Sequence, residues 1–429
     1  MDQRRSFLLA FLAAGPLCWS QTTADTQVLK IPFEQWLSEK DESHFRWTTR
    51  IGNPQLTYHQ RLKLRVEIQL DGAHLADTKG DKPLIFLTEL RDSAGQLYRT
   101  LHEIERADVQ RVSSSQNLVY APELLIVPGD YRIATGIYDS QSGEHSVQQK
   151  MLHVAPLKND PLPDAWNALP KVEFFQEGSL LDEAFLTYMK SGVSLAFRGE
   201  KRVSLKTVVN IAPGTTRHAV RTGEVRYQGA EPLLASMKLL AEAEVQAGRS
   251  RLALADITRR RVIFEQAEIS GQTDWTKLRA ALEDSSPNKI GIAELAKRSQ
   301  NAQFFASETQ RRMQPEDDGA LPVVIVMSQV MTLDSGEDLH PIATEGKTPG
   351  LLFYLRFHEP LTPLLAPTLP ERGGYRRNRP LDTARAEMLE PIDSLAPVLK
   401  NLHPRIIEIY APEQFRKALR TIMDEVAKL

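Results

Sequence analysis

The spacing of apolar residues changes between the two halves of this chain, and that change constrains the fold most. Residues 61–70 alternate strictly between polar and apolar, and the apolar face runs from Leu62 to Leu70. This alternation predicts a strand buried on one face. From about Ser204 onward, apolar runs of strand length alternate with segments of helical spacing, which predicts a mainly parallel sheet with helices on both faces. The length of 429 residues also suggests two or three domains.

The first folded half has the pattern of an antiparallel β-sandwich. Further runs of strand length are separated by polar turns, and we expect strands at 84–91, 96–104, 118–127, 131–138 and 146–154. Pro128-Gly129-Asp130 predicts a turn, because proline fixes φ and glycine allows a positive φ. The step from this turn into Tyr131 resembles immunoglobulin-like (Ig-like) accessory domains of exported proteins, although there is no Cys…Trp…Cys pattern. We assign the sandwich to residues 57–156, after an N-terminal extension at 21–56.

The N-terminus has the pattern of a signal peptide at residues 1–20. Arg4 and Arg5 precede an apolar run at 6–19, and the small residue Ser20 follows it. A membrane anchor is the alternative, but the run is shorter than the ~20 residues that span a bilayer. The single cysteine, Cys18, lies inside this segment, and Leu17 before it does not fit a lipoprotein signal. We predict a periplasmic or extracellular protein without stable membrane insertion after cleavage.

Composition and motifs argue against several classes of function. The formal net charge is −2 and the pI is near 6.6, so no general basic field would hold nucleic acid. The ten histidines are scattered, and neither a zinc spacing, a Gly-x-Ser-x-Gly elbow nor a phosphate-binding glycine loop is present. We therefore assign no catalytic residue and no cofactor. A hydrolase with an unrecognised site remains an alternative.

The second half carries a resemblance to a known family. Prolines at 156–170 mark the exit from the sandwich, and we assign 157–202 to a linker and edge elements. After it come RLALADITRRRVIFEQ at 251–266, PVVIVMSQ at 322–329, and RIIEIYAPEQFRKALRTIMDEV at 405–426. In this order, residues 203–429 resemble the von Willebrand factor A-like (vWA-like) domains of exported bacterial proteins. The resemblance implies a doubly wound α/β domain with a Rossmann-type sheet.

The metal site of that family is degenerate in this chain. The family uses Asp-x-Ser-x-Ser after the first strand, a threonine from a second loop and an aspartate after the fourth strand, all of them oxygen ligands that suit Mg²⁺. The resemblance places other residues there: Asn210, Ala212, Gly214, Ile290 and Gln329. These positions provide no carboxylate, so we predict no metal site of the family type.

The loops at the carboxyl ends of the strands remain the expected binding face of such a sheet. The polar residues that we place on this face are Thr215, Thr216, Asn288, Gln329, Asp334 and Glu337. The acidic loop at 334–338 would supply ligands if a cation site were rebuilt, but we interpret it as a solvated loop. A second long loop, at 359–382, is rich in proline and basic residues, which indicates either a recognition segment or a disordered one.

These patterns favour an exported binding protein over an enzyme. We predict that a metal-independent vWA-like domain mediates adhesion or another protein–protein interaction with a protein partner that the sequence does not identify. One alternative is a metal-dependent adhesion module with rebuilt ligands. The other is the hydrolase named above.

Overall fold

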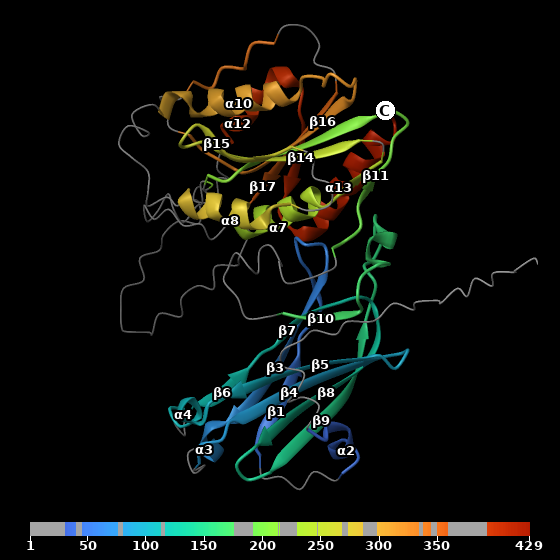
Figure 1. Cartoon of the computed structure of the whole chain (residues 1–429), viewed down its shortest axis with the longest axis vertical. Helices are drawn as coiled ribbons and strands as arrows, with labels where there is room; N and C mark the ends of the chain where they lie inside the picture. Colours follow the sequence, from blue (N-terminus) through green and yellow to red (C-terminus); the bar gives the residue numbers. More distant parts are fainter. Residues whose placement is uncertain are drawn as a thin grey trace, which may run out of the picture. The chain divides into compact units, whose positions relative to one another are not determined.

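A computed structural model of the chain shows a β-rich protein with several sheets (Figure 1). It describes residues 31–39, 45–75, 80–112, 116–175, 192–212, 214, 230–246, 248–267, 273–285, 298–333, 338–344, 350–358 and 393–429. These residues form two compact units. The prediction of a β-rich chain with more than one structural unit is therefore confirmed. In the described part of the chain, no helix is both long and apolar enough to cross a membrane.

The first unit comprises the described residues up to Ile51, together with Val66–Pro122 and Gly129–His153. Its elements are α2 (Phe33–Trp36), β1 (Trp47–Ile51), β3 (Leu62–Asp71, from Val66 onward), α3 (Gly72–Leu75), β4 (Leu84–Asp92), β5 (Leu97–Ile104), α4 (Arg106–Val109), β6 (Asn117–Tyr120), β8 (Gly129–Asp139) and β9 (His145–Val154). One sheet has the order β5-β4-β8-β9. In the other, β3 pairs antiparallel with both β1 and β6.

The core of this unit lies between its two sheets. Ile68 and Leu70 of β3 pack in one cluster with Phe86 of β4 and Ile137 of β8, and all four are fully buried. The alternation over 62–70 predicted this buried face correctly, because successive side chains of a strand point to opposite sides. A second cluster places Phe33 of α2 against the β4–β8 pair. The sequence had left Phe33 in an extension without assigned structure.

The second unit comprises Gly52–Arg65, Glu123–Pro128 and the described residues from Val154 to Leu429. Its smaller elements are β2 (Gln55–Leu56), β7 (Glu123–Ile126), η1 (Pro163–Trp166), β10 (Val172–Phe174), β11 (Ala196–Phe197), β13 (Glu244–Val245), η4 (Arg298–Gln300) and η5 (Lys400–Leu402). Its main strands are β12 (Val203–Asn210), β14 (Arg249–Asp256), β15 (Arg261–Gln266), β16 (Leu321–Gln329), β17 (Leu351–Phe357) and β18 (Arg405–Ile409). Its helices are α7 (Ala230–Ala241), α8 (Trp275–Asp284), α10 (Asn301–Arg312), α12 (Leu395–Leu399) and α13 (Pro412–Val426).

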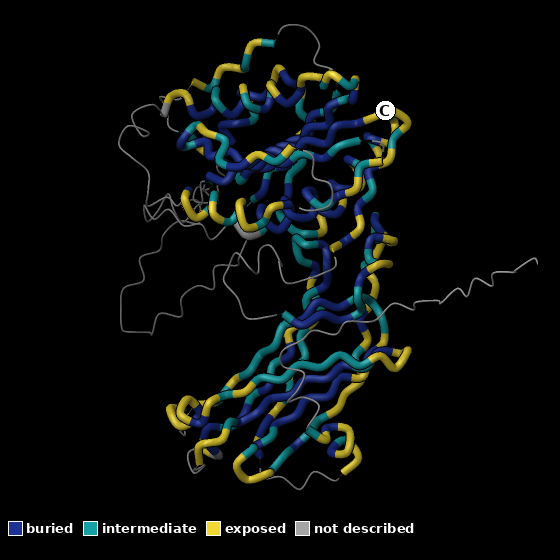
Figure 2. The backbone as a smooth tube through the Cα atoms, viewed as in Figure 1, coloured by how far each residue is buried: buried dark blue, intermediate teal, exposed yellow. Residues whose placement is uncertain are grey.

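The six main strands form one sheet in the order β15-β14-β12-β16-β17-β18. All neighbours pair in parallel except β14 and β15, which are antiparallel. Every residue of the inner strand β12 is buried, and dark tube runs through the middle of this sheet in Figure 2. Residues of α7 and α13 pack on one face of the sheet, and residues of α10 and α12 pack on the other.

Some element boundaries differ from the sequence-based expectation. The expected strand at 118–127 is divided into β6 and β7 around Pro122, which has no N–H to donate to a ladder. Helix α7 ends at Ala241, because the chain then forms β13, which pairs in parallel with β11. Pro412 begins α13, at a helix position that needs no N–H.

Candidate binding site at the carboxyl ends of the parallel strands

Asn210 ends β12 at the edge of the sheet where we expected the binding face. Its side chain is fully buried. The Asn210 Nδ2 donates to Ser328 Oγ at 2.9 Å and lies 2.8 Å from Met331 Sδ. The Asn210 Oδ1 accepts the Ala212 N–H at 3.1 Å. Both ends of the carboxamide are therefore bonded inside the protein.

Gln329 occupies the end of the neighbouring strand β16. Its Oε1 accepts the N–H of Gly214 at 2.6 Å. The turn is packed so closely here that a Cβ on Gly214 would stand 2.5 Å from the Cβ of Gln329. The side chain of Gln329 is thus fixed against this turn.

The structure brings four predicted site positions together: Asn210, Ala212, Gly214 and Gln329. The other predicted positions lie outside the described residues: Thr215, Thr216, Asn288, Ile290, Asp334 and Glu337. The loop at 359–382 also lies outside them. Among the residues that the structure describes, no group of three or more His, Cys, Asp or Glu side chains is placed to hold a metal ion.

A charged cluster at the same edge was missed by the sequence analysis. Arg356 of β17 forms ion pairs with Asp393 at 3.3 Å and with Glu408 of β18. The parallel register sets Arg356 directly opposite Glu408. The second oxygen of Glu408 lies 2.6 Å from His358 Nε2. The signal for this cluster was the polar spacing inside an apolar strand, where Tyr354, Arg356 and His358 recur at every second residue.

Tyr354 connects this cluster to the core. Its hydroxyl is 3.3 Å from Asp393 Oδ1, which also accepts the Leu395 N–H at the start of α12. Burial, followed by the negative charge of Asp393, raises the pKa of Tyr354 well above its usual value. Tyr354 therefore stays protonated and donates its hydrogen bond to the carboxylate.

An open groove of about 650 Å³ begins at Arg356 and Asp393. Its remaining lining residues come from α12, η5, the turn after η5 and β18: Ala396, Pro397, Lys400, His403, Pro404 and Ile406. Ile406 is 41 % exposed, although its side chain is large and apolar. The described residues of the groove lining include no serine, threonine or cysteine that could act as a nucleophile. Its chemistry suits contact with an apolar side chain flanked by charged groups.

Comparison with known proteins assigns no family to this chain. No protein-family model matches it, and no curated protein matches it either. A family 123 glycoside hydrolase from Clostridium perfringens aligns over 88 % of this chain and 87 % of its own, with 8 % identity and a TM-score of 0.21. The Bordetella pertussis protein assigned as ApaA aligns over 26 % of this chain and 97 % of its own, with 8 % identity and a TM-score of 0.17.

A β-glucosidase from Listeria innocua aligns over 26 % of this chain and 16 % of its own, with 12 % identity and a TM-score of 0.16. These scores are too low to relate the fold or the activity of those proteins to this one.

Proposed function

We propose that this chain is an exported interaction protein whose second unit is a metal-independent vWA-like domain. The strand order of the main sheet supports this assignment. Numbered along the chain, its strands lie in the order 3-2-1-4-5-6, which is typical of doubly wound α/β domains. The helices on both faces agree with it. The two antiparallel sheets of the first unit support an Ig-like sandwich as its companion.

The observation that carries the proposal is the bonding of Asn210 and Gln329. A cation at this edge would need several hard oxygen ligands and compensating negative charge. The two amide side chains supply no charge, and their oxygens already accept the backbone N–H groups of Ala212 and Gly214. This end of the sheet is therefore built to be stable without a metal, and partner binding would use the groove surface instead.

The metal-independence is tested by thermal melting of the mature chain, from Gln21 onward, in EDTA and then in millimolar Mg²⁺ or Ca²⁺. A cation at ~100 times its dissociation constant would add about 2.7 kcal/mol of stability. We expect no shift of the melting temperature. A clear shift would overturn the proposal and favour a cation site rebuilt from the acidic loop at 334–338.

The partner-binding role is tested by site-specific photo-crosslinking in the cell that produces the protein. A photoreactive phenylalanine at Ile406, which is 41 % exposed in the groove, should give a discrete adduct. The same residue at Lys417, which is exposed on α13, is the matched control and should give none. Adducts at neither site, or equally at both, would contradict a specific partner in the groove.

The rival hydrolase function has one observation in its favour, the contact of 2.6 Å between His358 and Glu408. Such a pair can transfer protons in catalysis. If the pair is structural, His358→Gln should leave any hydrolytic activity of the purified protein unchanged. A measurable hydrolysis that is lost in His358→Gln would make the enzyme function the better one.

A further inference from the structure

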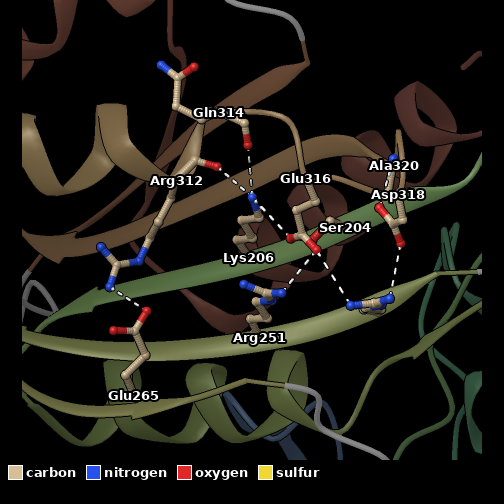
Figure 3. A network of polar contacts seen from close by, with 10 residues as sticks. Ser204, Lys206, Arg251, Glu265, Arg312, Gln314, Glu316, Asp318 and Ala320 are labelled. Atoms are coloured by element: carbon tan, nitrogen blue, oxygen red, sulfur yellow. Dashed lines mark hydrogen bonds and ion pairs between the residues drawn. The ribbon is translucent and has the colours of Figure 1, made fainter.

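A second pocket lies on the α10 face of the same sheet, toward the amino ends of β12 and β14. Its volume is about 70 Å³. The lining residues come from β12, β14, β15 and the end of α10: Lys206, Thr207, Arg251, Leu252, Ala253, Glu265, Arg311 and Arg312. Figure 3 shows the polar network around it. This pocket shares no residue with the groove at the carboxyl ends.

Positive charge predominates in the lining. Of the described lining residues, four have cationic side chains and one, Glu265, has a carboxylate. Their other acidic partners are Glu316, which pairs with Lys206 at 3.2 Å and Arg251 at 3.0 Å, and Glu308, which pairs with Arg311 and Arg312. Among the residues that the structure describes, these four cations therefore meet three carboxylates, which leaves one positive charge in excess.

Backbone carbonyl oxygens hold one of these cations, Lys206, in place. Lys206 Nζ, on a side chain that is 7 % exposed, donates to the carbonyl oxygens of Arg312 and Gln314 at 3.0 and 3.1 Å. Together with Glu316, these acceptors satisfy all three ammonium donors. The carbonyl end of α10 thus fixes the position of the lysine and stabilises its positive charge. Arg251 Nε is buried and has no hydrogen-bond acceptor among the described residues.

We propose that this pocket binds a small oxyanion, namely a phosphate group, between Arg251, Arg311 and Arg312. Guanidinium groups present parallel N–H donors that match the oxygens of such an anion. A cavity needs a volume on the order of 10–15 Å³ to hold one water molecule. The pocket volume of about 70 Å³ therefore suits a bare anion or a terminal phosphate group and excludes a larger ligand.

Glu265 acts as the exchangeable occupant of this pocket. It accepts from Arg312 at 3.2 Å and from Arg311 at 3.5 Å, while its side chain is 46 % exposed. A carboxylate so exposed can turn to the solvent without a large desolvation change. The incoming anion then takes its place beside both arginines. Binding is therefore an exchange of a weakly held internal carboxylate for a divalent ligand.

The experiment titrates the mature chain with inorganic phosphate at constant ionic strength in EDTA, by calorimetry and thermal melting. We expect a saturable rise of the melting temperature with phosphate and none with chloride. Arg251→Gln should abolish the response, and Arg420→Gln, at an exposed position on α13, should not. Glycerol phosphate distinguishes the two forms of the ligand. Binding as tight as that of inorganic phosphate indicates a terminal phosphate group, and weaker binding indicates the free ion.

Glu265→Gln keeps the proposal testable if Arg251→Gln does not fold. Loss of this carboxylate removes the competitor of the anion, so the dissociation constant for phosphate should fall by on the order of tenfold. The position is half exposed, so the variant should fold normally. An unchanged affinity in Glu265→Gln, or a phosphate response equal to that of chloride, would overturn the proposal.

Discussion

Arg416 offers the sharpest test of what stabilises the second unit. It lies on α13 with only 1 % of its side chain exposed. Its Nε and Nη2 bind the two carboxylate oxygens of Asp160 at 2.6 and 2.8 Å. The Arg416 Nη2 also donates to the Leu162 carbonyl at 2.7 Å, and the guanidinium lies 4.7 Å from the ring centre of Trp166. One side chain therefore fastens the segment at 160–166 to the C-terminal helix.

Arg416→Met removes the charge and keeps most of the aliphatic volume. Breaking a buried ion pair by removing one partner costs about 3–5 kcal/mol, because the other charge remains without compensation. Asp160 is 13 % exposed and keeps the hydrogen bond from the Leu162 N–H at 2.9 Å. We therefore expect Arg416→Met to lower the free energy of unfolding by about 3 kcal/mol, the lower end of this range.

The assay is urea unfolding followed by far-UV circular dichroism. The matched control is Arg420→Met, one turn along the same helix, where the arginine is 51 % exposed and forms an ion pair with Asp424 at 2.9 Å. An exposed pair of this kind contributes about 0–1 kcal/mol. If Arg416→Met costs no more than Arg420→Met, the reasoning about the buried pair is refuted.

The same pair predicts a pH dependence. Burial alone would raise the pKa of Asp160, but the hydrogen bonds from Arg416 and the Leu162 N–H, together with the charge of Arg416, lower it overall. Because the folded pKa lies below the unfolded value of about 3.9, the stabilisation is full at neutral pH and is lost as the pH falls through the folded pKa. The difference in stability between wild type and Arg416→Met should therefore shrink in acid.

Three further predictions concern other parts of the molecule. Gly136→Ala should destabilise the first unit by about 1–3 kcal/mol in urea unfolding, because its Cβ would stand 2.6 Å from the ring of Phe33; an unchanged midpoint would show that the ring moves freely. Lys206→Met should lower the unfolding free energy by about 3 kcal/mol, since it removes the ion-pair partner of Glu316 and leaves the carbonyl oxygens of Arg312 and Gln314 without this donor; an unchanged or stabilised variant would contradict this. The raised pKa of Tyr354 means that the unfolded chain loses this proton first, so stability should fall above about pH 10 and fall less in Tyr354→Phe; identical alkaline unfolding of the two proteins would refute this.

The strands were predictable from the sequence because their pattern is local. The alternation in 62–70 predicted one buried face of β3, and the apolar run at 322–328 predicted most of β16, the neighbour of β12. Lys206 inside β12 gave no such signal, because a lysine between apolar residues is normally exposed. Its burial depends on carbonyl oxygens 106 and 108 positions away in the sequence. Local periodicity contains no information about acceptors at that distance.

For the candidate site, the sequence predicted which residues lie together but not the contacts that they form. Asn210 and Gln329 could be placed together, because the carboxyl ends of neighbouring parallel strands meet at one edge of a sheet. Asn210 accepts the N–H of Ala212, and Gln329 accepts the N–H of Gly214. Both hydrogen bonds depend on the geometry of the turn, which residue types do not specify. The pair of Arg356 and Glu408 depends on the register of β17 against β18, and the sequence does not state that register.

The polar groups at the two ends of the main sheet differ in how far their hydrogen bonds and charges are already satisfied within the protein. At the carboxyl ends, Asn210 and Gln329 have their oxygens occupied by backbone donors. Toward the amino ends, the cations around Arg251 outnumber their carboxylate partners in the part of the chain that the structure describes. An anion is therefore expected where the family analogy would not place a ligand. The two proposals are separable, since Arg251→Gln should remove the phosphate response and leave the crosslink at Ile406 intact; loss of both would mean that the anion acts on the groove through the sheet.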